Sequence, residues 1–122
     1  MSDVNEREKM RSLVEIIRQF VAERDWEKFH TPKNLVMAMN VEVAELMEPF
    51  QWVQSGDIAE IGSERMVAVR HELADVFMYL ILLSDKLEVD LFDVCYEKIE
   101  INRRKYPADK VRGSSMKYYE YK

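Results

Sequence analysis

The segment from Ser63 to Leu83 is the strongest constraint on the fold, because apolar residues cover most of its helical circumference. They recur at steps of three and four, the spacing of an α-helix: Met66, Val69, Leu73, Val76, Phe77, Leu80 and Leu83. A helix with so wide an apolar surface is stable in water only when neighbouring chain covers it on several sides. The sequence therefore predicts a helical protein in which this segment is covered by other helices or by a second copy of the chain.

Three further helices are expected from periodicity and from capping residues. They span residues 4–25, 32–48 and 91–106. Thr31 and Asp90 are the expected N-caps of the second and the last of these helices, and Pro49 ends the second. Residues 53–62 contain two of the three glycines and are expected to form a loop, with Ser63 capping the helix that follows.

The fold class follows from these spans. Three Gly and three Pro in 122 residues are too few for a sandwich or barrel, which needs frequent turns. We expect an all-α protein, a small four-helix bundle over residues 1–107 followed by a basic, tyrosine-rich tail over residues 108–122. Because one chain of this size cannot cover the apolar helix, we also expect a homo-oligomer.

Charge and cysteine usage narrow the expected partners and location. Residues 1–97 are acidic overall, which argues against a nucleic-acid partner, whereas residues 98–122 are basic. The single cysteine, Cys95, cannot form an intramolecular disulfide. The longest apolar run, residues 76–83, is too short to span a bilayer, and no apolar leader follows Met1. We therefore expect a cytoplasmic protein without a membrane partner.

Two acidic pairs are the strongest functional signal. Glu42 and Glu45 lie three residues apart in one expected helix, and Glu72 and Asp75 repeat this spacing in the next, so each pair shares a helix face. In an antiparallel pairing that sets Glu42 opposite Asp75, Glu45 falls opposite Glu72. The same register places the chain reversal at residues 58–59, within the expected loop. The four carboxylates are therefore expected to converge.

Converging carboxylates among aliphatic side chains repel one another, and a divalent cation offsets that repulsion. Oxygen ligands alone favour Mg²⁺ or Mn²⁺, whose open positions are commonly filled by substrate phosphates. Zinc fits poorly, because His71 has no second histidine at ligand spacing. The alternative is that these acids are solvated or paired with Arg65 and Arg70.

A basic helix face and several aromatic residues complete the candidate site. Lys98, Asn102 and Tyr106 share one face of the last helix, with Arg104 beside them, and this face can hold phosphate oxygens or complement the dipole of its own helix. Aromatic side chains can stack on a base or pack in the core, and His30 can contact a ligand or a loop. The aromatic candidates are Trp26, Trp52 and Tyr79.

Four stretches stand in the order FVAERDWEKFHTPKNL, VEVAELMEPFQW, HELADVFMYL and KIEINRRKYP. Together they resemble the all-α MazG-like nucleoside triphosphate pyrophosphohydrolases, most closely the dCTP pyrophosphatase branch. One departure is Ile17, where eukaryotic members of that branch carry a histidine. The resemblance implies hydrolysis of a nucleoside triphosphate to the monophosphate and pyrophosphate, and assembly as a homodimer or homotetramer.

The resemblance also implies roles for individual residues. Mg²⁺, or Mn²⁺ in its place, would be bound by Glu42, Glu45, Glu72 and Asp75. Phosphate and sugar contacts would come from Lys98, Asn102 and either Arg104 or Tyr106. Base contacts would come from Trp26, His30, Trp52 and Tyr79. Glu45 is our candidate for the carboxylate that activates water. Because the antiparallel register places Trp52 and Tyr79 on opposite sides of the acids, a neighbouring chain is expected to supply part of the base pocket.

Two readings of the function remain open. The first is Mg²⁺-dependent hydrolysis of dCTP, or of a related or modified deoxynucleoside triphosphate. The alternative is a non-catalytic helical oligomer, an adaptor or binding module whose acidic face and basic tail bind proteins. One simple measurement distinguishes the two hypotheses, because only the first predicts dependence on a divalent metal.

Overall fold

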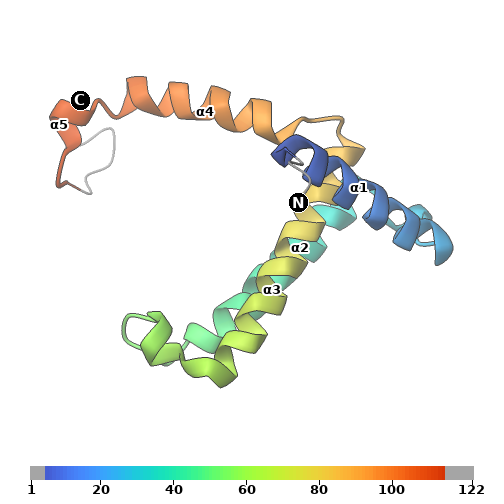
Figure 1. The fold of residues 1–122 in the computed structure, drawn as a ribbon, viewed down its shortest axis with the longest axis horizontal. Helices are drawn as coiled ribbons and strands as arrows, with labels where there is room; N and C mark the ends of the chain where they lie inside the picture. The colour runs from blue at the N-terminus through green and yellow to red at the C-terminus, as the bar shows by residue number, and fades with distance from the viewer. Residues whose placement is uncertain (1–4, 115–122) are drawn as a thin grey trace. The chain divides into compact units, whose positions relative to one another are not determined.

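A computed structural model describes residues 5–114, and every regular element in that range is helical (Figure 1). The elements are α1 (Glu6–Glu23), η1 (Glu27–Phe29), α2 (Pro32–Met47), η2 (Glu48–Phe50), α3 (Ile58–Lys86), α4 (Leu91–Lys105) and α5 (Ala108–Val111). The expected all-α class with four long helices is confirmed. None of the helices in this range is both long and apolar enough to cross a membrane.

The chain forms two compact units, Met1–Glu88 and Val89–Lys122, which we describe separately. The first unit holds α1, α2 and α3, and the second holds α4 and α5. The expected division into a domain over residues 1–107 and a tail stays a prediction. Within that tail, α5 is a short helix, and the tyrosines of residues 118–121 lie outside the described residues.

Helix α2 begins as its sequence predicts. The Thr31 hydroxyl accepts a hydrogen bond from the backbone N–H of Asn34 at 3.2 Å, and Pro32 is the first helical residue. The Asn34 side chain donates to the carbonyl of Phe29 at 2.9 Å, so the start of α2 is tied to η1. Pro49 follows the end of the helix, which its ring prevents from continuing.

Helix α3 begins earlier than expected, because residues 58–61, which were predicted as loop, form a helical turn, whereas the long helix resumes after Gly62, next to the predicted start at Ser63. The Asp57 carboxylate accepts the backbone N–H of Glu60 at 2.9 Å and caps an additional turn that starts at Ile58. At Gly62 the backbone leaves helical geometry, with φ 79° and ψ 160°, and the helix then resumes. Because glycine tolerates this conformation, the capped turn and the long helix join at a kink.

The loop before α3 is organised by the carboxylate of Glu60. This carboxylate accepts the backbone N–H groups of Gln54 at 2.7 Å, Ser55 at 2.9 Å and Gly56 at 2.9 Å. Hydrogen bonds to the ionised form favour it, and they lower the pKa of Glu60 to about 2. The Glu60 carboxylate therefore stays ionised across the physiological pH range and can accept these hydrogen bonds from residues 54–56 throughout it.

Within the first unit, α2 and α3 run antiparallel side by side, and α1 packs against the C-terminal half of α3 (Figure 1). Ile17 and Val21 of α1 are buried against Ile81 of α3. Leu35 of α2 is 1% exposed. The antiparallel pairing of α2 and α3 brings the two acidic pairs together, and α1 forms a wall beside them.

Candidate metal centre and adjoining pocket

Three glutamates form a carboxylate cluster between α2 and α3. Carboxylate oxygens of Glu42, Glu45 and Glu72 lie within 4.8 Å of one another, and all three side chains are half-buried. Asp75, one turn after Glu72, is close enough for its charge to act on Glu42. The structure thus brings together the helix faces that carry the two acidic pairs.

Two oxygens of this cluster lack a partner. Glu42 Oε2 and Glu72 Oε2 are buried and have no hydrogen-bond partner among the described residues. Desolvation, together with Glu45 lying against it, raises the pKa of Glu42 to about 7, and desolvation also raises the pKa of Glu72. Buried, unsatisfied oxygens in an all-carboxylate cluster fit a hard divalent cation such as Mg²⁺ or Mn²⁺.

The raised pKa of Glu42 gives a pH prediction for the metal-free protein. The ordinary value of 4.5 applies to the unfolded chain, so the folded chain holds this proton more tightly. The stability that protonated Glu42 contributes is fully present below about pH 4.5 and is lost as pH rises through about 7. In urea unfolding with a chelator present, the urea concentration at the midpoint should therefore decrease as the pH is raised from 5 to 8. The variant Glu42→Gln should flatten this decline, and an unchanged slope would exclude Glu42 as its cause.

An apolar pocket of about 380 Å³ adjoins the carboxylate cluster. Glu42 and Asp75 form part of its lining, together with three of the aromatic-ring residues predicted to contact a base, Trp26, His30 and Tyr79. The rest of the lining is apolar: Leu13, Ile16, Ile17, Phe20, Val21, Met78 and Leu82. The pocket therefore joins an acidic end to an apolar, aromatic interior.

The ring residues of the apolar pocket have identifiable supports. Trp26 meets Phe20 edge to face, with ring centroids 5.9 Å apart, and the Arg24 guanidinium lies 3.6 Å from the centroid of Phe20. His30 Nδ1 is buried and has no hydrogen-bond partner among the described residues. Desolvation and the charges of the neighbouring acids raise the pKa of Tyr79, which keeps its hydroxyl protonated beside the carboxylates.

Other predicted site residues lie elsewhere. Trp52 is in the turn between α2 and α3 and is 88% exposed, and it does not line the apolar pocket. The remaining candidates belong to the second unit, where Lys98 and Arg104 are exposed and Asn102 and Tyr106 are half-buried. Their contribution to a site stays a prediction.

Sequence reasoning missed the wall that α1 contributes to the pocket. The apolar periodicity of that helix was used only to predict its span, yet Ile16 and Phe20 line the pocket and remain exposed. The signal was present as an apolar stripe on α1 wider than one packed face requires. An exposed apolar surface of this kind marks a binding site or an interface.

The all-α fold and the acidic cluster between antiparallel helices define a helical protein with a candidate metal centre. Comparisons with known proteins identify its family. The MazG-like family matches residues 37–120, and the chain belongs to this family. A crystal structure of a pyrophosphatase from Archaeoglobus fulgidus superposes with a TM-score of 0.77 and 41% sequence identity, covering 88% of this chain and 98% of that one.

Two curated relatives are dCTP pyrophosphatases. The chain is 46% identical over 104 residues to dCTP pyrophosphatase 1 of Homo sapiens, which covers 84% of this chain and 61% of that protein. It is 45% identical over 103 residues to dCTP pyrophosphatase 1 of Mus musculus, which covers 82% of this chain and 60% of that protein. The chain therefore spans about three fifths of the length of the curated relatives it matches.

Proposed function

We propose that this protein hydrolyses a nucleoside triphosphate to the monophosphate and pyrophosphate, with dCTP or a modified dCTP as the first candidate substrate. The observation that carries the proposal is the carboxylate cluster, with its unpartnered buried oxygens, beside an apolar and aromatic pocket whose lining it shares through Glu42. The sequence identity to dCTP pyrophosphatases supports the choice of substrate. Water adds to the α-phosphorus, the bond to the bridging oxygen breaks, and pyrophosphate leaves.

The carboxylate cluster and Asp75 would hold Mg²⁺, or Mn²⁺ in its place. The cation, when bound, supplies positive charge that offsets the charge of the phosphate oxygens. Glu42 and Glu72 each have an unpartnered oxygen available for it. Glu45 is our candidate for the residue that orients the attacking water and accepts its proton, because it lies within the cluster on the face of α2.

The apolar pocket would hold the base. Trp26 and Tyr79 offer aromatic surfaces for stacking, and His30 Nδ1 offers a buried polar atom for a hydrogen bond. Ile17 leaves this part of the wall apolar. A base with an apolar substituent therefore suits the pocket.

The phosphates and sugar would be contacted from α4, by Lys98 and Asn102 and by either Arg104 or Tyr106. We further propose a cytoplasmic homodimer or homotetramer. Apolar side chains on α2 and α3 support assembly, since Met37, Met47 and Leu73 are each more than half exposed within the first unit. In such an assembly, Trp52 would complete the base pocket of a neighbouring chain.

The test is pyrophosphate release from a panel of canonical and 5-modified nucleoside triphosphates, with Mg²⁺ and with chelator, and with the nucleotide product identified by chromatography. We expect metal-dependent formation of the monophosphate, fastest with dCTP or a modified dCTP. A diphosphate product would mean attack at the γ-phosphorus and would overturn the mechanism. Absence of turnover with every triphosphate would overturn the proposed activity.

A further inference from the structure

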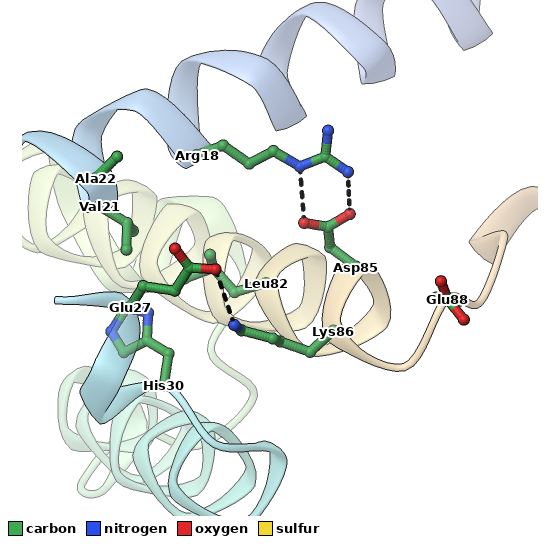
Figure 2. Close-up of a pocket in the computed structure, with 9 residues that line it drawn as sticks. All are labelled: Arg18, Val21, Ala22, Glu27, His30, Leu82, Asp85, Lys86 and Glu88. Carbon is green, nitrogen blue, oxygen red and sulfur yellow. Dashed lines mark hydrogen bonds and ion pairs between the residues drawn. The ribbon is translucent and has the colours of Figure 1, made fainter. Parts of the chain in front are cut away.

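A second pocket, of about 410 Å³, lies between α1, η1 and the last turns of α3 (Figure 2). We call it the polar pocket, because charged side chains surround it. Its lining shares Val21, His30 and Leu82 with the apolar pocket, so the two cavities are neighbours separated by these side chains. Whatever fixes the rim of the polar pocket also fixes one wall of the apolar pocket.

Two ion pairs cross the polar pocket (Figure 2). Arg18 of α1 donates two hydrogen bonds to the carboxylate of Asp85 on α3, one of them from Nε at 2.8 Å. Lys86 Nζ, on the next residue of α3, lies 3.3 Å from Glu27 Oε1 of η1. Both pairs therefore join the α1 and η1 segment to the last turn of α3.

The polar pocket does not itself offer a site for an anionic ligand. The Arg18 guanidinium is already bonded to Asp85 and Glu15, and the Lys86 ammonium is paired with Glu27. The bidentate contact also raises the pKa of Arg18 and lowers that of Asp85, so both remain charged. The charges of this pocket are thus used to connect helices.

The apolar contact between α1 and α3 is small enough for these ion pairs to matter. The buried residues in it are Ile17, Val21 and Ile81, whereas Ile16 and Phe20 face the apolar pocket and remain exposed. The opposite wall stands on α3, which packs extensively with α2. The α1 and η1 wall is therefore the less firmly held side of the apolar pocket.

We propose that the Arg18–Asp85 and Glu27–Lys86 ion pairs form a clasp that positions the α1 and η1 wall, with Trp26 and His30, against α3 and so sets the affinity for the base. These four are positioning residues, because they act through the wall. This inference rests on the proposed function for its link to nucleotide affinity. The clasp itself is a statement about the wall and is measurable without any nucleotide.

The kinetic test is a double-mutant cycle on the bidentate pair. We expect Arg18→Gln and Asp85→Asn each to raise KM for the nucleotide about fivefold, with kcat within about twofold, because the wall is loosened and the carboxylate cluster is untouched. The double variant should be no worse than either single variant, since both remove the same contact. KM values within about twofold of the native protein, or effects that add, would overturn the clasp.

A matched control and a second readout keep the test specific. Lys9→Gln removes an exposed ion pair of 3.5 Å to Glu6 within α1 and should leave KM unchanged. For the second readout, Trp52→Phe leaves Trp26 as the single tryptophan. Arg18→Gln in that background should increase acrylamide quenching of Trp26 fluorescence, whereas Lys9→Gln should not.

The two readouts separate the clasp from the proposed function. Increased quenching in a protein that hydrolyses no triphosphate would support the clasp and overturn the activity. Unchanged quenching in an active enzyme would overturn the clasp and leave the activity standing. Because Arg18 is half exposed and Asp85 is only partly buried, thermal unfolding should remain cooperative in every variant of the cycle.

Discussion

Replacing Glu72 by Gln should reduce hydrolysis of the nucleoside triphosphate by roughly a thousandfold while raising the melting temperature of the metal-free protein. The loss is expected because removing one carboxylate weakens binding of the cation. The transition state then loses roughly 4 kcal/mol of charge stabilisation, which corresponds to a thousandfold in rate. The gain is expected because Glu72 Oε2 is buried without a partner beside Glu42 and Glu45. A neutral amide removes one charge from that cluster.

Two measurements on the same samples check that Glu72→Gln lowers turnover and raises the melting temperature of the metal-free protein. Pyrophosphate release gives turnover, and circular dichroism on heating gives the melting temperature with chelator and with Mg²⁺. The native protein should melt at a higher temperature when Mg²⁺ is present, because a ligand that binds only the folded chain stabilises it. Glu72→Gln should lose most of this metal-induced shift.

Glu64→Gln is the matched control, because Glu64 is an exposed acid on the same helix and outside the carboxylate cluster. It should change neither turnover nor the metal-induced shift. Unchanged turnover in Glu72→Gln would remove the acids from the mechanism. If Mg²⁺ does not change the melting temperature of the native protein, the adaptor hypothesis is favoured, in which the acidic pairs bind no cation.

The starts of two of the helices could be predicted from local signals. Thr31, Pro32 and Asp90 are capping or first-turn residues whose effect depends on neighbours in sequence, so α2 and α4 begin where expected. The register argument worked for a similar reason, since spacing of three on each of two antiparallel helices leaves little choice of facing residues. The start of α3 was missed because the turn between Asp57 and Gly62 depends on a cap and on a loop held by Glu60.

The pocket was harder to predict, because its wall comes from long-range packing. Trp26 and Tyr79 were identified by residue type, whereas the wide apolar stripe of α1 does not by itself say which of its residues, such as Ile16 and Phe20, face a cavity and which face a core. The contact between Arg18 and Asp85 joins positions 67 residues apart, and no periodicity within one helix reports such a pair. Charged residues on exposed helix faces are so common that their partners become visible only in three dimensions.

Replacing Trp26 by Ala should raise KM for the nucleotide about five- to 140-fold, because stacking of a base on an aromatic ring contributes about 1–3 kcal/mol. Trp26→Phe keeps an aromatic face and should recover most of this loss. Trp26 is 43% exposed, so the fold should survive either change. Steady-state kinetics with dCTP give the result, and a KM for Trp26→Ala equal to that of the native protein would place the base elsewhere.

Trp52→Ala distinguishes a pocket built by one chain from a pocket shared between two. Trp52 is 88% exposed and lies outside the apolar pocket of its own chain, so Trp52→Ala should raise KM only if a neighbouring chain receives this side chain. We expect that rise.

Mixing the two alanine variants then tests the sharing directly, because a mixed dimer contains one site with both tryptophans intact. Equal amounts of the Trp26→Ala and Trp52→Ala variants, unfolded and refolded together, should recover about a quarter of native activity if two-fold symmetric dimers form at random. If each chain instead builds its whole pocket alone, Trp52 is not part of any pocket, and the mixture shows only the average of the activities of the two variants. A native monomer with full activity at low concentration would contradict the shared pocket in the same way.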